Sequence, residues 1–592
     1  DELRKIFAGM AEYQVVGISG NRLDISTKAS GVKRTSMAMS SALDITEFAA
    51  ENIFPAQFVY YSKNPIGKVT LENTGKADIK NIKAKIFIPA YMQMASEQVI
   101  PELKAGTKQT FNVSATLDKE KLLTITENTL AQIKAEISYN QAGEEKVRSI
   151  TRPVTIYNRN SVSWNKPNQI GAFVTYKDPA VENFSRSVIG NVKFDASVYP
   201  NASRNMVNAM KTWDAVRAFS INYVTDPWVV AEGDVLDEIQ YPRQTLAKKA
   251  GDCDDSSVLL SACLENIGIH TALLGTADHV FIMFDTGVNK KNASRVSLNE
   301  REYVIRDNAV WIPLETTIIN KSFAEAWHVG VEEYYKTVDA KGKLDVIDIR
   351  KAWETSPPTN LASDEKISAT PAQAEIEKLL TEDSRTMAAA SNQMLDEKVK
   401  ALKAKNDEKS SNEAAMILAN AGKYDEAIAV ITMFTSASAS NNRGNIYLLK
   451  GDSLNAYKSY TEAVKADAKD GGIDLNMGLL KYLGGDHSGT VESFADAVSK
   501  FPSQEQAYAE LGIDNIVAEI NQTRAAQKNV VIDKGELQNL LLNALQDLQA
   551  RKDARTVSRQ VRRGENRFVF GGRRGIDPTA AANIKDFLYW KM

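Results

Sequence analysis

The chain has 592 residues, of which 43% are hydrophobic and 25% are charged, proportions typical of globular proteins. This length exceeds what one hydrophobic core organises and predicts about three to five domains. The formal net charge of −3 excludes a general attraction to nucleic acid or to acidic membranes, so we expect no nucleic-acid partner. No run of about 18 apolar residues occurs, and we therefore expect no transmembrane segment.

Residues 1–160 are predicted to form β structure. In residues 1–54, alternation at 13–16 and 22–25 predicts two strands, followed by an extended segment. Residues 55–160 predict an antiparallel β-sandwich, because several short segments alternate with period two between turn signals such as Asn73-Thr74-Gly75. The six predicted strands are 57–62, 68–73, 79–88, 109–117, 131–139 and 146–157. The run from Val69 to Gly75, together with Ile82–Ile86, resembles bacterial Ig-like adhesion and spacer modules.

Residues 161–354 change to a mixed α and β pattern. Asp178 and Pro179 are the cap and the first residue of a predicted helix, and a second helix is expected at 205–219. A further helix should follow Gly251. The predicted strands are 271–275, 280–285, 302–306 and 310–313. This arrangement predicts an α+β domain.

Residues 355–408 are interpreted as a linker and a helix. The stretch 355–375 is rich in Ser, Thr, Pro, Asp and Glu, a composition typical of linkers. The stretch 372–406 is rich in Ala, Glu, Lys and Leu, which predicts a helix.

Residues 409–535 contain an internal repeat with a period of 34. It relates four pairs of positions, namely Gly444 and Gly478, Gly451 and Gly485, Tyr460 and Phe494, and Ala463 and Ala497. Small residues where paired helices cross, with an aromatic near the end of the second helix, resemble the tetratricopeptide repeat. The resemblance implies about three all-α units that stack into a concave surface for protein or peptide partners. Self-assembly is a further mode of contact that such a surface suits.

Residues 536–592 complete the chain with a capping helix and a basic tail. The helix is predicted at 534–552, where it would seal the last repeat. Between Arg551 and Arg574 there are nine basic residues, eight of them Arg. A solvated or partner-docking segment explains this run better than a nucleic-acid or lipid site, because no recognisable reader fold surrounds it.

The sequence Gly251-Asp252-Cys253-Asp254-Asp255 places a cysteine at the start of a predicted helix. Gly251 permits the turn and Asp252 is a good helix cap. The free N–H groups and the dipole at a helix N-terminus favour a negative sulfur and can hold an oxyanion. His279 opens an apolar strand and Glu315 closes another, so the three residues predict a thiol acyl-transfer site. Asp307, on a neighbouring strand, is the rival for the third position.

These motifs resemble the transglutaminase-like superfamily, whose papain-related fold includes transglutaminases and bacterial thiol peptidases. The resemblance covers about residues 165–335 and rests on Gly251–Asp255 with its apolar helix, on His279 before its strand and on Trp311–Glu315. It implies that Cys253 is the nucleophile, His279 the base and Glu315 the orienting acid. The family usually has Asp where Glu315 stands and often has Gly where Asp278 stands. If neither Glu315 nor Asp307 reaches His279, the domain is a non-catalytic relative.

The other polar and aromatic residues near the motif have ordinary interpretations. Cys263 lies on the apolar helix face and belongs to the core. Two cysteines and four histidines exclude a disulfide framework and a zinc cluster, and we expect no cofactor. Some members of the family use calcium, for which Asp252, Asp254 and Asp255 are the weak candidate ligands, although capping and solvation explain them better. Trp228 and Tyr241 are interpreted as core residues rather than as lining of a cleft.

The sequence therefore predicts a multidomain protein with a β-sandwich, a papain/transglutaminase-like α+β domain and tetratricopeptide-type helical repeats. The first functional hypothesis is thiol-dependent acyl transfer on protein or peptide amides, as a peptidase, an amidase or a transglutaminase-type cross-linking enzyme. The alternative is a non-catalytic scaffold or assembly subunit that keeps the fold as an interaction module. For both hypotheses we expect a periplasmic, cell-envelope or extracellular bacterial protein, although the low cysteine content fits a cytosolic protein almost as well.

Overall fold

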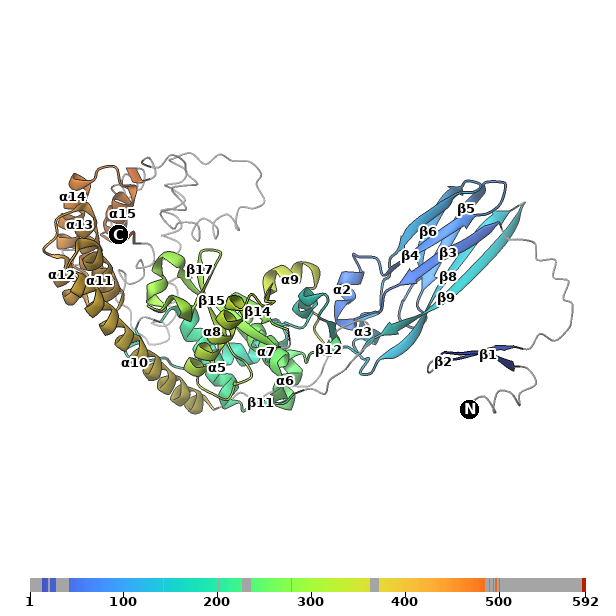
Figure 1. Ribbon diagram of the computed structural model, residues 1–592, viewed down its shortest axis with the longest axis horizontal. Coiled ribbons are helices and arrows are strands. Elements are labelled where there is room, and N and C mark those ends of the chain that lie inside the picture. Colours follow the sequence, from blue (N-terminus) through green and yellow to red (C-terminus); the bar gives the residue numbers. More distant parts are fainter. Residues whose placement is uncertain are drawn as a thin grey trace, which may run out of the picture. The chain divides into compact units, whose positions relative to one another are not determined.

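The computed structural model describes residues 13–19, 22–27, 42–141, 143–200, 202–225, 236–277, 279–361, 372–484, 489, 493, 496–497, 500 and 588–591. The chain divides into two compact units. The first unit comprises residues 1–52, 61–118 and 130–155, and the second comprises residues 53–60, 119–129 and 156–592. A β-rich region is followed along the chain by a mixed region and then by an all-helical region (Figure 1).

The first unit is built from antiparallel strands. One sheet has the strand order β3-β4-β7 and the other has the order β6-β5-β8-β9, and their arrows run from blue to cyan in Figure 1. The strands are β3 (Leu43–Ala50), β4 (Gly67–Asn73), β5 (Ile79–Phe87), β6 (Ser96–Leu103), β7 (Lys108–Val113), β8 (Thr129–Gln141) and β9 (Glu144–Ile156). A separate hairpin joins β1 (Tyr13–Ser19) to β2 (Arg22–Thr27), as the alternation there predicted.

Period-two burial explains these strands. In β8, Ala131, Ile133, Ala135 and Ile137 are buried while the residues between them are exposed or half-buried. Strand β6 was not predicted, and Pro101 lies within it. A proline cannot donate to a ladder, but β6 is an edge strand of its sheet, where the missing donor is tolerated.

The strand predicted at 57–62 is wrong. The segment forms a short 3-10 helix, η1 (Pro55–Gln57), followed by α2 (Phe58–Tyr61). Pro55 starts this turn because its fixed φ suits the first position of a helix. The Nε2 of Gln57 donates to the carbonyl of Gln169 at 2.9 Å, which holds the turn within the second unit.

The second unit contains a five-stranded sheet with the order β16-β17-β15-β14-β18. Its strands are β14 (Thr271–Gly275), β15 (Val280–Asn289), β16 (Val304–Arg306), β17 (Ala309–Leu314) and β18 (Asp345–Asp348). Four of them match the strands predicted at 271–313. Two pairs of short strands accompany the sheet. They are formed by β10 (Ser161–Ser163) with β12 (Leu236–Glu238) and by β11 (Asn222–Tyr223) with β13 (Ala250–Gly251).

Both faces of this sheet are covered. Leu273, Ile282 and Ile312 belong to the main core with the helices, while Ala272 and Phe281 belong to a smaller cluster on the opposite face. The helices around the sheet are α4 (Pro179–Asn191), α5 (Arg204–Ala218), α6 (Pro242–Lys248), α7 (Cys253–Asn266), α8 (Phe323–Asp339) and α9 (Ile349–Thr355), with α3 (Lys119–Leu122) and the 3-10 turns η2 (Pro167–Ala172), η3 (Lys290–Arg295) and η4 (Glu300–Glu302). Asp178 caps α4 by accepting from the N–H of Ala180, as predicted.

The helical region begins with a long helix and continues in antiparallel pairs. It comprises α10 (Gln373–Lys405), α11 (Glu408–Asn420), α12 (Tyr424–Ile431), α13 (Ala437–Lys450), α14 (Ser453–Ala466) and α15 (Gly471–Leu483) (Figure 1). Gly444 has a direct structural role in this region. A Cβ at Gly444 would lie 2.5 Å from the ring of Tyr460, so only glycine lets α13 and α14 cross there. Gly451 ends α13 in the left-handed conformation with φ +87°.

Several predictions fall outside the described residues. They concern Trp228, Asp278, the repeat positions at 485 and 494, the predicted helix at 534–552 and the arginine-rich run at 551–574. Within the described ranges, no helix combines the length and apolar character that a membrane crossing requires.

Candidate active site

Cys253 is the first residue of α7, and the turn before it is tightly constrained. Asp252 is the N-cap, and its side chain accepts from the N–H of Asp255, whose own side chain accepts from the N–H of Asp252. A Cβ at Gly251 would lie 2.6 Å from the side chain of Asp255. The sulfur therefore sits at the helix end where N–H groups lack acceptors within the helix.

The three aspartates around Cys253 are explained as parts of this cap. Their carboxylate oxygens lie within 4.8 Å of one another. The carboxylate of Asp255 accepts from the backbone N–H of Gln240 at 2.6 Å and also from the amide of that side chain. Burial and the neighbouring Asp252 raise the pKa of Asp254 well above its ordinary value. A calcium site needs six to eight oxygens, and the carboxylates of Asp252 and Asp255 are already used in the cap.

His279 and Glu315 meet where two adjacent strands end. His279 immediately precedes β15 and Glu315 immediately follows β17, and these strands pair antiparallel with Ile282 opposite Leu314. The Nε2 of His279 lies 2.8 Å from a carboxylate oxygen of Glu315. The other carboxylate oxygen accepts from the N–H and the hydroxyl of Thr317 at 2.8 and 2.7 Å. These bonds fix the direction in which Glu315 faces the imidazole.

The pKa values of this pair are shifted in the directions that favour charge. Burial lowers the pKa of His279, but hydrogen bonds to Cys253 and Glu315 outweigh it and raise the pKa to about 10. Burial raises the pKa of Glu315, but contacts with His279 and Thr317 outweigh it and leave the pKa below its ordinary value. Because Nε2 contacts Glu315, Nδ1 is the ring nitrogen left for the thiol. The imidazole is therefore bonded to Glu315 on one side, and Cys253 is the group that acts on its pKa from the other.

Asp307, the rival third residue, lies elsewhere. It occupies the turn between β16 and β17 with φ +49°. This turn precedes β17, whereas Glu315 follows the other end of the same strand. Its side chain is 73% exposed and pairs with Arg306 at 3.4 Å. Glu315 is consequently the acid that contacts His279.

Hydroxyl groups join the three elements of the site, and sequence patterns did not point to them. Thr316 donates to the carbonyl of Cys253 at 3.2 Å and lies 2.9 Å from the hydroxyl of Ser257 on α7. On α8, Gly330 packs against the end of β17, where a Cβ would lie 2.8 Å from Pro313 and 2.9 Å from the N–H of Glu315. Sequence offered no signal for these contacts, because each joins segments far apart in the chain.

Tyr223 is a further residue that sequence reasoning did not single out. Strand β11 pairs parallel with β13, and Tyr223 lies opposite Gly251, two residues before Cys253. Burial, followed by the negative charge expected at Cys253 and Asp252, raises the pKa of Tyr223 to about 12. The phenol, which is 39% exposed, therefore keeps its proton at neutral pH and can donate a hydrogen bond.

The remaining predictions near the site concern core residues. Tyr241 is fully buried and its hydroxyl donates to the carbonyl of Arg159 at 3.4 Å. Cys263 is fully buried within α7, and burial raises the pKa of its thiol to about 12. His270 pairs with Asp348 at 2.9 Å, so this histidine belongs to a separate ion pair.

No known protein-family model matches this sequence. No curated protein matches it either. The geometry of Cys253, His279 and Glu315 is therefore the main basis for a functional proposal.

Proposed function

We propose that this protein carries out thiol-dependent acyl transfer on protein or peptide amides, with Cys253 as nucleophile, His279 as acid and base, and Glu315 as the orienting acid. The observation behind the proposal is the hydrogen bond of His279 to Glu315, together with the place of Cys253 at the N-terminus of α7 and its effect on the pKa of His279. The same residues underlie the resemblance to transglutaminase-like enzymes, and we include membership of that superfamily in the proposal.

The reaction has two stages. The sulfur of Cys253 attacks the amide carbonyl, and the resulting tetrahedral oxyanion is held by N–H groups at the start of α7, with Tyr223 as a second donor. The C–N bond then breaks, the amine leaves with a proton from His279, and a thioester remains. Water or a lysine amine next loses a proton to His279, attacks the thioester and releases Cys253.

The identity of the second acceptor decides between two enzyme types. Water makes the protein a peptidase or amidase, whereas a lysine amine makes it a cross-linking enzyme. In either case we propose that the Ig-like β unit is a spacer and that the tetratricopeptide-type helices bind protein partners. A periplasmic, cell-envelope or extracellular site of action belongs to the same proposal.

The decisive experiment measures the reactivity of Cys253 and its products. Iodoacetamide at neutral pH should alkylate Cys253 far faster than a free thiol, with peptide mass spectrometry as the readout. Wild type and Cys253→Ala are then incubated with bacterial envelope proteins, and cleaved or isopeptide-linked products should appear with wild type alone. Cys263→Ala is the matched control, since this buried thiol should be dispensable. Slow alkylation together with no product would reject the enzyme and favour the non-catalytic scaffold.

A further inference from the structure

The helical region presents a set of buried asparagine side chains from three helices. Asn412 lies on α11, Asn441, Asn442 and Asn445 lie on α13, and Asn476 lies on α15. Each is at most 1% exposed. Burying an amide is unfavourable unless its donors and acceptor are hydrogen-bonded. The hydrogen-bond partners of these asparagines therefore show why they are buried.

Their main partner is the backbone of the last described segment of the chain, residues 588–591. Asn476 accepts from the N–H of Tyr589 at 2.8 Å and donates to its carbonyl at 2.7 Å. Asn442 accepts from the N–H of Lys591 at 2.9 Å and donates to its carbonyl at 2.6 Å. Two side-chain amides thus recognise alternate residues of an extended segment and set its register.

Neighbouring contacts hold these amides in place. The hydroxyl of Tyr460 donates to Asn445 at 2.8 Å, and Asn445 donates to the carbonyl of Tyr589 at 2.9 Å. Asn476 also donates to Asn441 at 2.9 Å, and Asn441 donates to the same carbonyl of Tyr589 at 2.9 Å. The helices therefore arrange the donors before any segment binds, which lowers the ordering cost of binding.

The side chains of the segment are recognised by different groups. Leu588 is 5% exposed and joins the helical core. The ring of Tyr589 covers Gly472, where a Cβ would lie 2.2 Å from the ring, and its hydroxyl donates to Asp470 at 3.3 Å. This pocket therefore requires glycine at 472.

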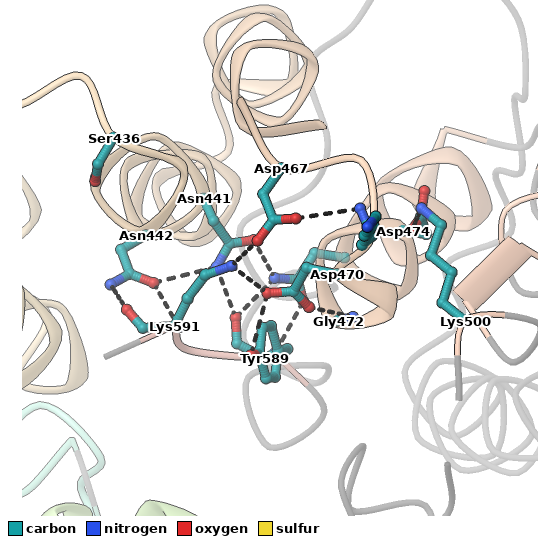
Figure 2. Close-up of polar contacts among 12 residues, drawn as sticks. Ser436, Asn441, Asn442, Asp467, Asp470, Gly472, Asp474, Lys500, Tyr589 and Lys591 are labelled. Carbon is teal, nitrogen blue, oxygen red and sulfur yellow. Dashed lines mark hydrogen bonds and ion pairs between the residues drawn. The ribbon is translucent and has the colours of Figure 1, made fainter. Parts of the chain in front are cut away.

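A basic residue completes the pattern. The Nζ of Lys591 lies 2.7 Å from Asp467 and 2.6 Å from Asp470, as Figure 2 shows. Such charge-assisted bonds are stronger than neutral ones. The contact with Lys591 in turn lowers the pKa of Asp467. The segment thus presents to the helices a large apolar residue, an aromatic residue and, two positions later, a lysine.

We propose that this face of the helical region is a sequence-selective groove for an extended peptide, and that residues 588–591 of the same chain occupy it as a built-in competitor. Amides that recognise the backbone fix the register, while Gly472, Asp467 and Asp470 select the side chains. Any partner peptide with the same pattern must displace the tail. The proposal does not depend on the chemistry of Cys253.

The test uses the full chain and a fluorescein-labelled peptide of residues 586–592, with binding followed by fluorescence anisotropy. The double variant Tyr589→Ala with Lys591→Glu should bind the peptide at least tenfold more tightly than wild type, because its own tail no longer competes. Adding Asn442→Ala and Asn476→Ala to that variant should abolish this binding. A peptide of the same composition in scrambled order is the control.

Two outcomes would overturn the proposal. Equal peptide affinity of wild type and the tail variant, with unchanged helical circular dichroism, would show that the tail does not compete for the groove. A wild-type dimer in light scattering that becomes a monomer in the tail variant would place the tail in a second copy rather than in its own chain. A charge exchange provides a positive check, since Asp467→Lys should restore binding to a peptide that carries Glu at position 591.

Discussion

At the scale of single residues, the site depends on how a carboxylate and a thiol together influence one imidazole. His279 is half-buried, which alone would favour its neutral form, yet its contacts with Cys253 and Glu315 raise its pKa to about 10. A positive imidazolium beside the sulfur stabilises the thiolate, which is the reactive form. Glu315 is therefore a positioning residue, because it acts on Cys253 through His279.

Glu315→Gln tests this role because it preserves size and removes charge. We expect the pKa of His279 to fall, so that the imidazolium is lost at a lower pH. In wild type the ion pair should persist as pH rises and disappear near pH 10, where His279 loses its proton. The rate of Cys253 alkylation against pH measures this, with a loss of about tenfold at neutral pH in the variant. Superimposable profiles would mean that Glu315 does not act on His279.

Tyr223→Phe separates a donor to the oxyanion from a structural ring. The substitution removes a hydroxyl and keeps the aromatic packing, so alkylation of Cys253 should be unchanged. If the phenol stabilises the oxyanion, kcat should fall by about 10²-fold with little change in KM, once a substrate is identified. A change confined to KM would instead place Tyr223 in substrate binding.

At the scale of elements, the site is held by close contacts between helices and strand ends. Gly330 of α8 touches the backbone just before Glu315, and the N–H of Glu315 donates to the carbonyl of Ala326 at 3.0 Å. Helix α8 therefore determines where the orienting carboxylate stands.

Gly330→Ala should destabilise the second unit by about 1–3 kcal/mol, because a methyl group has no room between α8 and β17. It should also slow Cys253 alkylation through displacement of Glu315. Urea unfolding and alkylation kinetics provide the two readouts. Gly190→Ala in α4 is the matched control, since a Cβ there meets nothing within 4 Å, and alanine is the better helix former. Equal effects of the two substitutions would contradict the packing argument.

The contact between helices α5 and α10 predicts that the stability of the protein depends on pH. Asp214 on α5 is fully buried, and burial together with Asp383 on α10 raises its pKa well above 3.8. The folded state thus holds a proton that the unfolded chain releases near its ordinary pKa. The free energy of unfolding should accordingly fall as pH rises from about 4 through the raised pKa.

Asp214→Asn should flatten this profile, since the amide stays neutral at every pH. Asp195→Asn is an informative contrast, because Asp195 is exposed and hydrogen bonds from Ser197 lower its pKa. Its contribution to stability has the opposite sign and is lost as pH falls. Urea unfolding curves across the pH range measure both effects, and an unchanged slope in Asp214→Asn would refute the assignment.

At the scale of the whole molecule, the two compact units have separate cores and are expected to unfold separately. Ile82→Ala removes a fully buried side chain from the first unit and should cost about 2–5 kcal/mol. Gly444→Ala forces a Cβ against Tyr460 in the second unit and should cost about 1–3 kcal/mol. Differential scanning calorimetry should show two transitions, each lowered by one substitution and not by the other. A single transition lowered by both would contradict independent units.

Sequence alone predicted the features that depend on local interactions. The cap at Asp178, the helix that begins at Cys253 and most strands follow from side-chain hydrogen bonds and periodicities within a few residues. The spacing of 34 also located the crossing of α13 and α14 at Gly444 and Tyr460. The strand expected at 57–62 failed because Pro55 favours a helical turn.

Only the tertiary structure decided which distant residues meet. Sequence left Glu315 and Asp307 as rivals, and the register of β15 with β17 brings Glu315 to His279 while Asp307 lies at the opposite end of its strand. The amide contacts of Asn441 with Tyr589 join residues 148 positions apart. Such contacts depend on sheet register and helix packing, which are set by the sum of many burial and hydrogen-bond terms across the chain and leave no local pattern.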